Sequence, residues 1–167
     1  MAQTATRGAS PLYRDIAERT QGELYIGVVG PVRAGKSTFI SNFMQQLVLP
    51  LVPPGPRRER IVDELPQSGS GKTIMTTQPK FVPSDGAATV QLPDHASARV
   101  RMVDSVGYLV RGGLGTQEGG DARMVSTPWS QQDMPFEEAA QLGTRKVMTD
   151  HATVGVVVTT DGTVAEL

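Results

Sequence analysis

The residues whose types and spacing most clearly indicate chemistry form a glycine-rich segment that ends in a lysine and a serine. Gly30, Gly35, Lys36 and Ser37 match the Walker A pattern G-x-x-x-x-G-K-[ST]. In this pattern backbone N–H groups cradle phosphates, the lysine reaches the β- and γ-phosphates and the hydroxyl binds Mg²⁺. The alternative is a tight turn with a chance lysine. The residues predicted to bind the nucleotide are Gly30, Pro31, Val32, Arg33, Ala34, Gly35, Lys36, Ser37, Thr38 and Gly107.

A second motif, Asp104-x-x-Gly107, follows an alternating apolar stretch that is typical of a strand. The D-x-x-G pattern is weak alone, and its alternative is an aspartate that merely ends a strand. Together with the upstream glycine-rich segment, it predicts that Asp104 holds Mg²⁺ through water and that the Gly107 amide senses the γ-phosphate. The predicted metal-binding residues are Ser37, Thr77 and Asp104.

Two threonines between these motifs, Thr76 and Thr77, stand where switch proteins carry a threonine that completes the Mg²⁺ shell. They are also ordinary β-forming residues before a strand. Arg33 places a permanent cation inside the phosphate loop. The hypothesis is that its guanidinium group supplies positive charge near the α- and γ-phosphates, within the site or across a subunit contact; the alternative is an arginine that faces solvent. The candidate catalytic residues are therefore Lys36, Thr76, Thr77, Asp104 and Arg33.

Two further positions indicate slow unaided turnover. Ser105 follows Asp104 where many motor ATPases carry a glutamate, and Tyr108 follows Gly107 where Ras-like switches carry a glutamine. Water activation is therefore expected to come from a mobile loop or another subunit.

A second Gly-Lys-Thr at 71–73 lacks the first glycine and a preceding buried strand, so we interpret it as part of a loop.

Regular elements flank the phosphate loop in the order that such a site requires. The apolar run 23–29 predicts a central parallel strand, and helical spacing predicts a helix over 37–49 that Pro50 ends. A further helix is expected over 12–20, and residues 50–71 are expected to be a long mobile connection. Short strands are predicted at 80–82, 89–92 and 98–103, a flexible stretch at 112–120, a helix over 135–151 and a buried strand at 153–158.

Length and composition indicate one domain, and the predicted strands and helices make it an α/β domain. The chain has 167 residues, of which 38% are hydrophobic and 20% charged, and its net charge is -1. No global field draws in nucleic acid or an anionic membrane. No Cys, no signal peptide and no apolar stretch long enough for a membrane span are present, so a soluble, cytoplasmic protein is expected. We expect a flexible tail at 1–11 and a P-loop domain at 12–167.

Several stretches, taken together, resemble the stage IV sporulation protein A family of endospore-forming bacteria. The resemblance runs from about Tyr13 to the last residue and is specific as a combination. It implies a P-loop NTPase of the translation-factor-related GTPase-like class, a three-layer sandwich with a mostly parallel sheet, that uses ATP and Mg²⁺. The stretches are 15–20, 27–30 continuing through 36–40, 63–68, 71–77 and 143–147.

For activity, the resemblance implies slow ATP hydrolysis that drives self-assembly of the spore coat basement layer around the forespore. It assigns Lys36 as the Walker A lysine, Asp104 as the Walker B-like aspartate, and Thr76 and Thr77 as sensor threonines. It implies a mother-cell location at the outer forespore membrane, a homopolymer, and as partners a small amphipathic membrane-anchoring peptide and other coat proteins, but no nucleic acid.

This chain departs from the family pattern in length. Family members continue for several hundred residues, through the remaining core strands, a middle domain and a C-terminal region. The domain is therefore expected to be incomplete at its C-terminus, and no base-reading motif distinguishes ATP from GTP. The alternatives are a non-hydrolysing interaction or structural fragment, and a GTP-binding switch or small P-loop kinase.

Overall fold

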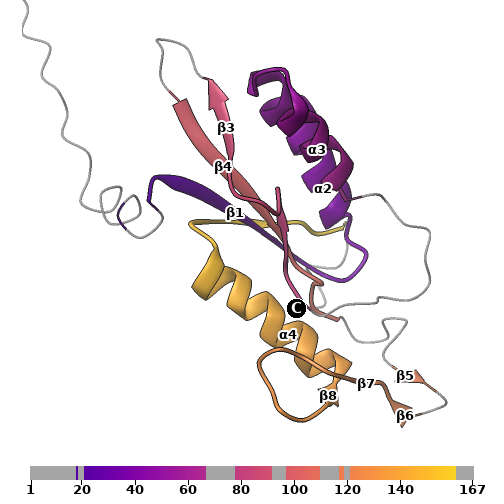
Figure 1. The fold of residues 1–167 in the computed structure, drawn as a ribbon. Coiled ribbons are helices and arrows are strands. Elements are labelled where there is room, and N and C mark those ends of the chain that lie inside the picture. The colour runs from indigo at the N-terminus through magenta and orange to yellow at the C-terminus, as the bar shows by residue number, and fades with distance from the viewer. Residues whose placement is uncertain are drawn as a thin grey trace, which may run out of the picture.

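The fold is a five-stranded, mostly parallel sheet with helices on both faces, seen in a computed structural model (Figure 1). The structure describes residues 18, 21–66, 78–91, 97–109, 117–118 and 121–160. The helix expected over 12–20, the second Gly-Lys-Thr segment, Thr76 and Thr77 lie almost wholly outside these residues. The main strands are β1 (Glu23–Val29), β2 (Lys80–Val82), β3 (Ala88–Gln91), β4 (Ser97–Asp104) and β9 (Val154–Val157).

The strand order β2-β4-β1-β9 places β1 at the centre of the sheet. β1 runs parallel to both β4 and β9, whereas β2 and β3 both pair with β4 in the antiparallel sense. In the register, Val28 lies opposite Asp104 on one side and opposite Val156 on the other. The carboxyl ends of three parallel strands therefore meet at one edge, where α/β sheets commonly bind ligands.

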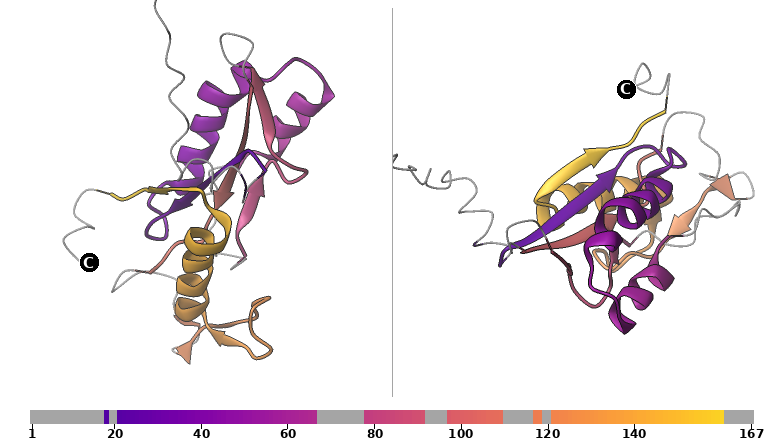
Figure 2. Two further views of the ribbon diagram at one scale, coloured as in Figure 1. Left: turned by 90° about the vertical axis from the view of Figure 1, so that its left-hand side faces the viewer. Right: turned by 90° about the horizontal axis from the view of Figure 1, so that it is seen from above.

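Helices α2 (Lys36–Phe43) and α3 (Pro56–Glu64) cover one face, and α4 (Phe136–Lys146) covers the other (Figure 2). Alternate residues of β1 separate these layers: Ile26 and Val28 join the core beneath α2 and α3, while Val29 packs with Val147 on the second face. Gly27 allows the close approach there, because a Cβ atom would lie 2.9 Å from Val147 Cγ1. The expected α/β class and layering are thus seen, with two antiparallel strands.

The helix after the phosphate loop extends slightly beyond the expected range. After α2, a π-helical turn (Met44–Val48) and a 3₁₀ turn (Leu49–Leu51) continue the helical backbone. Pro50 does not end the helical backbone at once: it lies at the start of the 3₁₀ segment, which ends one residue later at Leu51. Ile40, Met44 and Val48 are buried against the sheet.

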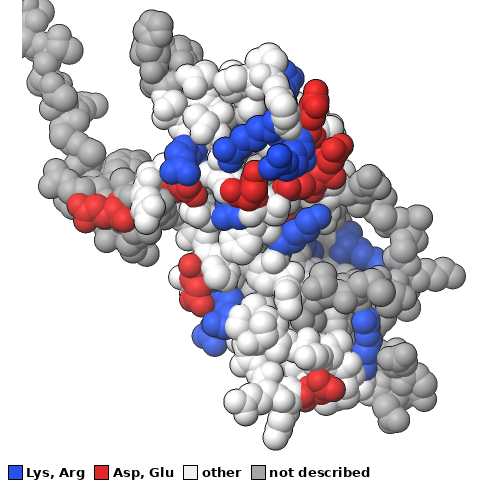
Figure 3. Space-filling view, viewed as in Figure 1, with Lys and Arg blue, Asp and Glu red and all other residues white. Residues whose placement is uncertain are grey.

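The expected long connection over residues 50–71 is wrong for its first part, because α3 occupies Pro56–Glu64. Gly55 is the N-cap and Pro56 stands in the first turn, a position in which proline favours a helix start. Ile61 and Leu65 are buried although charged residues surround them in the sequence. Figure 3 shows basic and acidic side chains side by side on the face that includes this helix, where Arg57 and Arg60 lie near Asp85.

The second correction concerns the C-terminal strand, which was expected to be buried. In β9, Val154 is 46% exposed and Val157 64% exposed. The reason is position: β9 ends the strand order and pairs only with β1 within the described residues. The apolar run therefore forms the expected parallel strand, but side chains of this strand are exposed rather than buried.

The remaining elements are small. Two hairpins that the sequence did not predict pair β5 (Gln117–Glu118) with β6 (Asp121–Ala122), and β7 (Met124–Val125) with β8 (Met134–Pro135). The helix expected over 135–151 is present as α4 followed by a π-helical turn (Val147–His151). None of the helices that the structure describes is long and apolar enough to cross a membrane.

Candidate nucleotide-binding site

The phosphate loop begins directly after β1, and its backbone needs glycine at two points. Gly30 has φ 148°, and a Cβ atom there would lie 1.9 Å from the carbonyl oxygen of Val158. Gly35 has φ 91° and is the N-cap of α2. Both φ angles belong to the region that residues with side chains rarely adopt. Arg33 also has a positive φ, 66°, so the loop holds a non-glycine residue in the left-handed region.

Backbone hydrogen bonds join this loop to the segment that follows β4. The Val32 amide donates to the Tyr108 carbonyl oxygen at 2.8 Å, and the Tyr108 amide donates to the Gly30 carbonyl oxygen at 3.2 Å. Pro31 and Tyr108 form a parallel bridge. Within the loop, the Ala34 amide donates to the Pro31 carbonyl oxygen at 3.1 Å. The two motifs found in the sequence are thus one structural unit.

The N-terminus of α2 offers hydrogen-bond donors to an anion. The Phe39 amide makes the first bond of the helix, to the Gly35 carbonyl oxygen at 2.8 Å. The amides of Lys36, Ser37 and Thr38 precede this bond and have no acceptor within the helix. No side chain of the described residues caps this end. These amides and the positive end of the helix dipole are therefore suited to phosphate oxygens.

Lys36 lies at the centre of the site. The residue is only 5% exposed, and its Nζ atom donates to the Pro31 carbonyl oxygen at 2.7 Å. Burial lowers the pKa of the lysine from 10.5 to about 8, although the nearby Asp104 carboxylate opposes this shift. A buried cation with one neutral acceptor is poorly compensated. A polyphosphate would supply the negative charge that this ammonium group lacks.

Asp104 is at the end of β4 and faces the start of α2. Its Oδ2 atom accepts a hydrogen bond from Ser37 Oγ at 2.8 Å, whereas its Oδ1 atom is buried and has no hydrogen-bond partner among the described residues. Burial raises the pKa of Asp104, and the Ser37 hydrogen bond and the charges of Lys36 and Lys80 oppose this rise.

These oxygens fit a divalent cation. An unsatisfied carboxylate oxygen beside a hydroxyl is a suitable ligand pair for Mg²⁺, which commonly uses one or two protein groups together with substrate phosphates. The part of the chain that is described contains no cluster of three or more His, Cys, Asp or Glu residues for a metal. A cation at Ser37 and Asp104 would need ligands beyond these two described residues, and nucleotide phosphates can supply some of them.

Gly107 closes the site from the β4 side. A Cβ atom at this position would lie 2.3 Å from Lys36 Nζ and 2.4 Å from the Gly30 carbonyl oxygen, and the Gly107 φ angle is 95°. The D-x-x-G segment thus packs directly on the lysine amine. Ser105, by contrast, is buried, and its hydroxyl donates to the Val28 carbonyl oxygen at 2.8 Å.

The structure thus brings together most of the residues that the sequence singled out. The loop 30–37, Thr38 in the first turn of α2, Asp104 and Gly107 converge at the carboxyl edge of β1 and β4, whereas the chemical roles assigned to them stay predictions. Thr76 and Thr77 lie outside the described residues. Sequence reasoning missed Lys80, which pairs with Asp104 across two strands, because no local pattern gives the register of an antiparallel pair.

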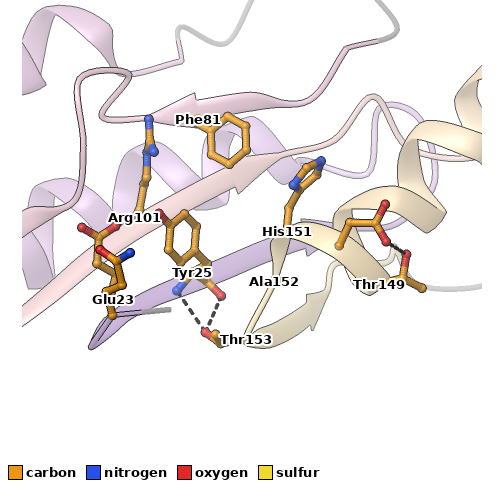
Figure 4. Close-up of a pocket in the computed structure, with 10 residues that line it drawn as sticks. Glu23, Tyr25, Phe81, Arg101, Thr149, His151, Ala152 and Thr153 are labelled. Atoms are coloured by element: carbon orange, nitrogen blue, oxygen red, sulfur yellow. Dashed lines mark hydrogen bonds between the residues drawn. The ribbon is translucent and has the colours of Figure 1, made fainter. Parts of the chain in front are cut away.

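A separate pocket of about 660 Å³ opens at the other end of the sheet, near the start of β1 (Figure 4). Tyr25, Phe81, Arg101 and His151 converge on it from β1, β2, β4 and the end of the α4 segment. Arg101 Nε donates to the Pro83 carbonyl oxygen at 2.8 Å, and its guanidinium carbon lies 4.7 Å from the centre of the Phe81 ring. None of the residues that line this pocket belongs to the phosphate site.

Comparisons with known proteins give the family. The family model described as "Stage IV sporulation protein A, ATPase domain" matches residues 8–167. Proteins named stage IV sporulation protein A are 60% identical over 153 residues in Clostridioides difficile (strain 630) and 53% identical over 156 residues in Bacillus subtilis (strain 168). A third, from Bacillus anthracis, is 51% identical over 156 residues.

These matches cover 92% of this chain and 31% of the Clostridioides difficile protein, and 93% of this chain and 32% of each Bacillus protein. The chain thus spans about a third of the length of these relatives. No solved structure matches it. With a family model matched over nearly its whole length, at the domain that contains the phosphate loop, the chain belongs to the stage IV sporulation protein A family.

Proposed function

We propose that this chain binds and hydrolyses ATP with Mg²⁺, and that hydrolysis drives self-assembly of the coat basement layer around the forespore. The observation that carries the proposal is the convergence of the buried Lys36 amine and the Ser37–Asp104 pair at the uncapped start of α2. The family name, with its ATPase domain, favours ATP as the nucleotide and sporulation as the setting. The geometry itself favours a triphosphate, without distinguishing the base.

In this proposal each residue of the site has a defined role. Lys36 exchanges its bond with the Pro31 carbonyl oxygen for bonds with the β- and γ-phosphates, and Gly107 offers its amide to the γ-phosphate. Ser37, Thr77 and Asp104 hold Mg²⁺, which when bound neutralises phosphate charge. Thr76 and Thr77 couple hydrolysis to a change of conformation. Arg33 adds positive charge beside the loop.

The wider assignments follow the family resemblance alone. We propose that residues 12–167 are a P-loop domain of the translation-factor-related GTPase-like class, preceded by a tail at 1–11. Its partners are further copies of itself, a small amphipathic membrane-anchoring peptide and other coat proteins. Its place is the mother-cell cytoplasm at the outer forespore membrane.

A second candidate is a chain that binds nucleotide without hydrolysing it. The observation that favours it concerns Ser105 and Tyr108, which stand where motor ATPases carry a glutamate and Ras-like switches carry a glutamine to activate water. The Ser105 hydroxyl donates a hydrogen bond to the Val28 carbonyl oxygen, and the Tyr108 backbone forms hydrogen bonds with the phosphate loop. Neither arrangement supplies a base for water, so turnover needs a group from elsewhere.

Phosphate release from Mg²⁺-ATP by the purified chain tests the first proposal. We expect slow release that Lys36→Ala abolishes, whereas the second candidate predicts the same background rate for both proteins. Competition of labelled ATP with unlabelled ATP and GTP decides the base, and preference for GTP would support a GTP-binding switch.

Thr76→Ala with Thr77→Ala should leave ATP binding nearly intact and slow hydrolysis; weakened binding would instead assign these threonines to nucleotide binding. Sedimentation with ATP and without it reports whether assembly follows hydrolysis.

A further inference from the structure

Lys80, the first residue of β2, lies directly opposite Asp104 in the antiparallel pairing of β2 with β4. The same pairing places Phe81 opposite Val103 and Val82 opposite Met102. Residues that face each other in this way have Cβ atoms about 4.5–5.5 Å apart. A lysine is therefore fixed beside the carboxylate by the sheet itself, at the edge where the phosphate loop begins.

The side chains of Lys80 and Asp104 also project from the same face of the sheet. Val82 and Met102 both belong to the core beneath α2. Because successive side chains of a strand alternate between faces, the residues two positions away, Lys80 and Asp104, share that face. The hydrogen bond from Ser37 to Asp104 confirms that this is the face on which α2 starts.

The Lys80 ammonium group is available for an anion. Lys80 is exposed, and its charge acts on Asp104 from across the strands. It takes part in none of the salt bridges within 4 Å that the described residues form, unlike other basic residues of the chain. The sheet places this cation beside the phosphate site, where the described residues form no ion pair with it within 4 Å, so it can interact with a ligand that brings negative charge.

We propose that Lys80 is a positioning cation of the nucleotide site, whose ammonium group attracts the anionic complex of metal and triphosphate to the Asp104 edge of the sheet. The inference rests on the proposed ATP site and adds to it a residue outside both motifs. Mg²⁺ neutralises only part of the triphosphate charge, so the complex is still an anion. Lys80 acts by charge at a distance, whereas Lys36 acts by direct contact.

Titration of the full chain with Mg²⁺-ATP at low and high salt tests this difference. For a charge about 8 Å from the complex in a water-like medium, we expect Lys80→Gln to weaken binding about three- to tenfold at low salt. At ~1 M salt the screening length falls to about 3 Å, so the defect should disappear. Lys80→Arg keeps the charge and should bind as the wild-type chain does.

The matched control is Arg145→Gln, which removes an exposed cation from α4 on the opposite face of the sheet. This variant should bind Mg²⁺-ATP as the wild-type chain does at both salt concentrations. An equal loss of affinity in Arg145→Gln and Lys80→Gln would mean that only net charge matters, and would overturn the inference. A Lys80→Gln defect that persists at high salt, or that Lys80→Arg shares, would also overturn it.

Lys36→Ala separates this inference from the function on which it rests. We expect this variant to lose binding at both salt concentrations, because its amine contacts the phosphates directly. If Lys36→Ala abolishes binding while Lys80→Gln binds normally at low salt, the ATP site stands and the role of Lys80 is refuted. If the wild-type chain binds no Mg²⁺-ATP, both proposals fall together.

Discussion

Lys36→Met should stabilise the nucleotide-free chain at neutral pH while abolishing nucleotide binding. The physical reason is that Lys36 is buried, with 5% of its surface exposed, and donates to one neutral acceptor, the Pro31 carbonyl oxygen. Methionine has a similar length and no charge, so it fits the same space without the cost of burying an ammonium group. Lys36 thus lowers the stability of the nucleotide-free chain and raises its affinity for nucleotide.

The magnitude follows from the pKa of Lys36, which burial lowers from 10.5 to about 8. At 1.36 kcal/mol per pKa unit, this shift disfavours the charged amine in the folded chain by about 3 kcal/mol. Methionine also loses the hydrogen bond to the Pro31 carbonyl oxygen, which costs about 1 to 1.5 kcal/mol. We therefore expect Lys36→Met to raise the free energy of unfolding by about 2 kcal/mol at pH 7.

The effect should depend on pH in a defined window. Below about pH 8 the lysine is charged in both the folded and the unfolded chain, so the whole cost is present. Between about 8 and 10.5 the folded chain releases the proton while the unfolded chain keeps it. Because the unfolded state then binds more protons, the stability of the wild-type chain rises with pH in this window. The advantage of methionine should therefore shrink and change sign within this window.

Urea unfolding of the two proteins, followed by circular dichroism across this pH range, measures the difference directly. Effects of titrating groups that do not interact with Lys36 cancel, since both proteins share them. A stability difference that does not change with pH would refute the reasoning, as would a methionine variant that is less stable at pH 7. ATP should stabilise the wild-type chain alone.

Three other substitutions give clear expectations. Gly107→Ala places a Cβ atom 2.3 Å from Lys36 Nζ at a φ of 95°, so it should cost about 1–3 kcal/mol in unfolding free energy and weaken ATP binding, as calorimetry and thermal melts can measure; unchanged affinity would contradict the packing. Asp104→Asn should abolish the gain in ATP affinity that Mg²⁺ provides but preserve binding in EDTA, which paired titrations with and without the metal will check. Arg33→Ala should slow phosphate release from saturating ATP by about tenfold or more, and a full rate would exclude a role for that guanidinium group in hydrolysis.

The sequence by itself determined the elements whose signals are local. The apolar run of β1, the glycines and lysine of the phosphate loop and the helical spacing after Ser37 are consecutive in the chain, and the structure has the strand at Glu23–Val29 and α2 from Lys36. The helix at α4 and the strands β2 to β4 were also found to within a few residues. In each case one segment carries its own periodicity and its own start or stop signal.

Only the tertiary structure decided what depends on pairing between distant segments. The exposure of β9 follows from its place at the end of the strand order, which no property of Val154 or Val157 reveals. Lys80 acquires its place beside Asp104 from an antiparallel register between segments that are far apart in the chain. Contacts of this kind depend on which backbone groups meet across the sheet, and a pattern read along one segment contains no information about its neighbour.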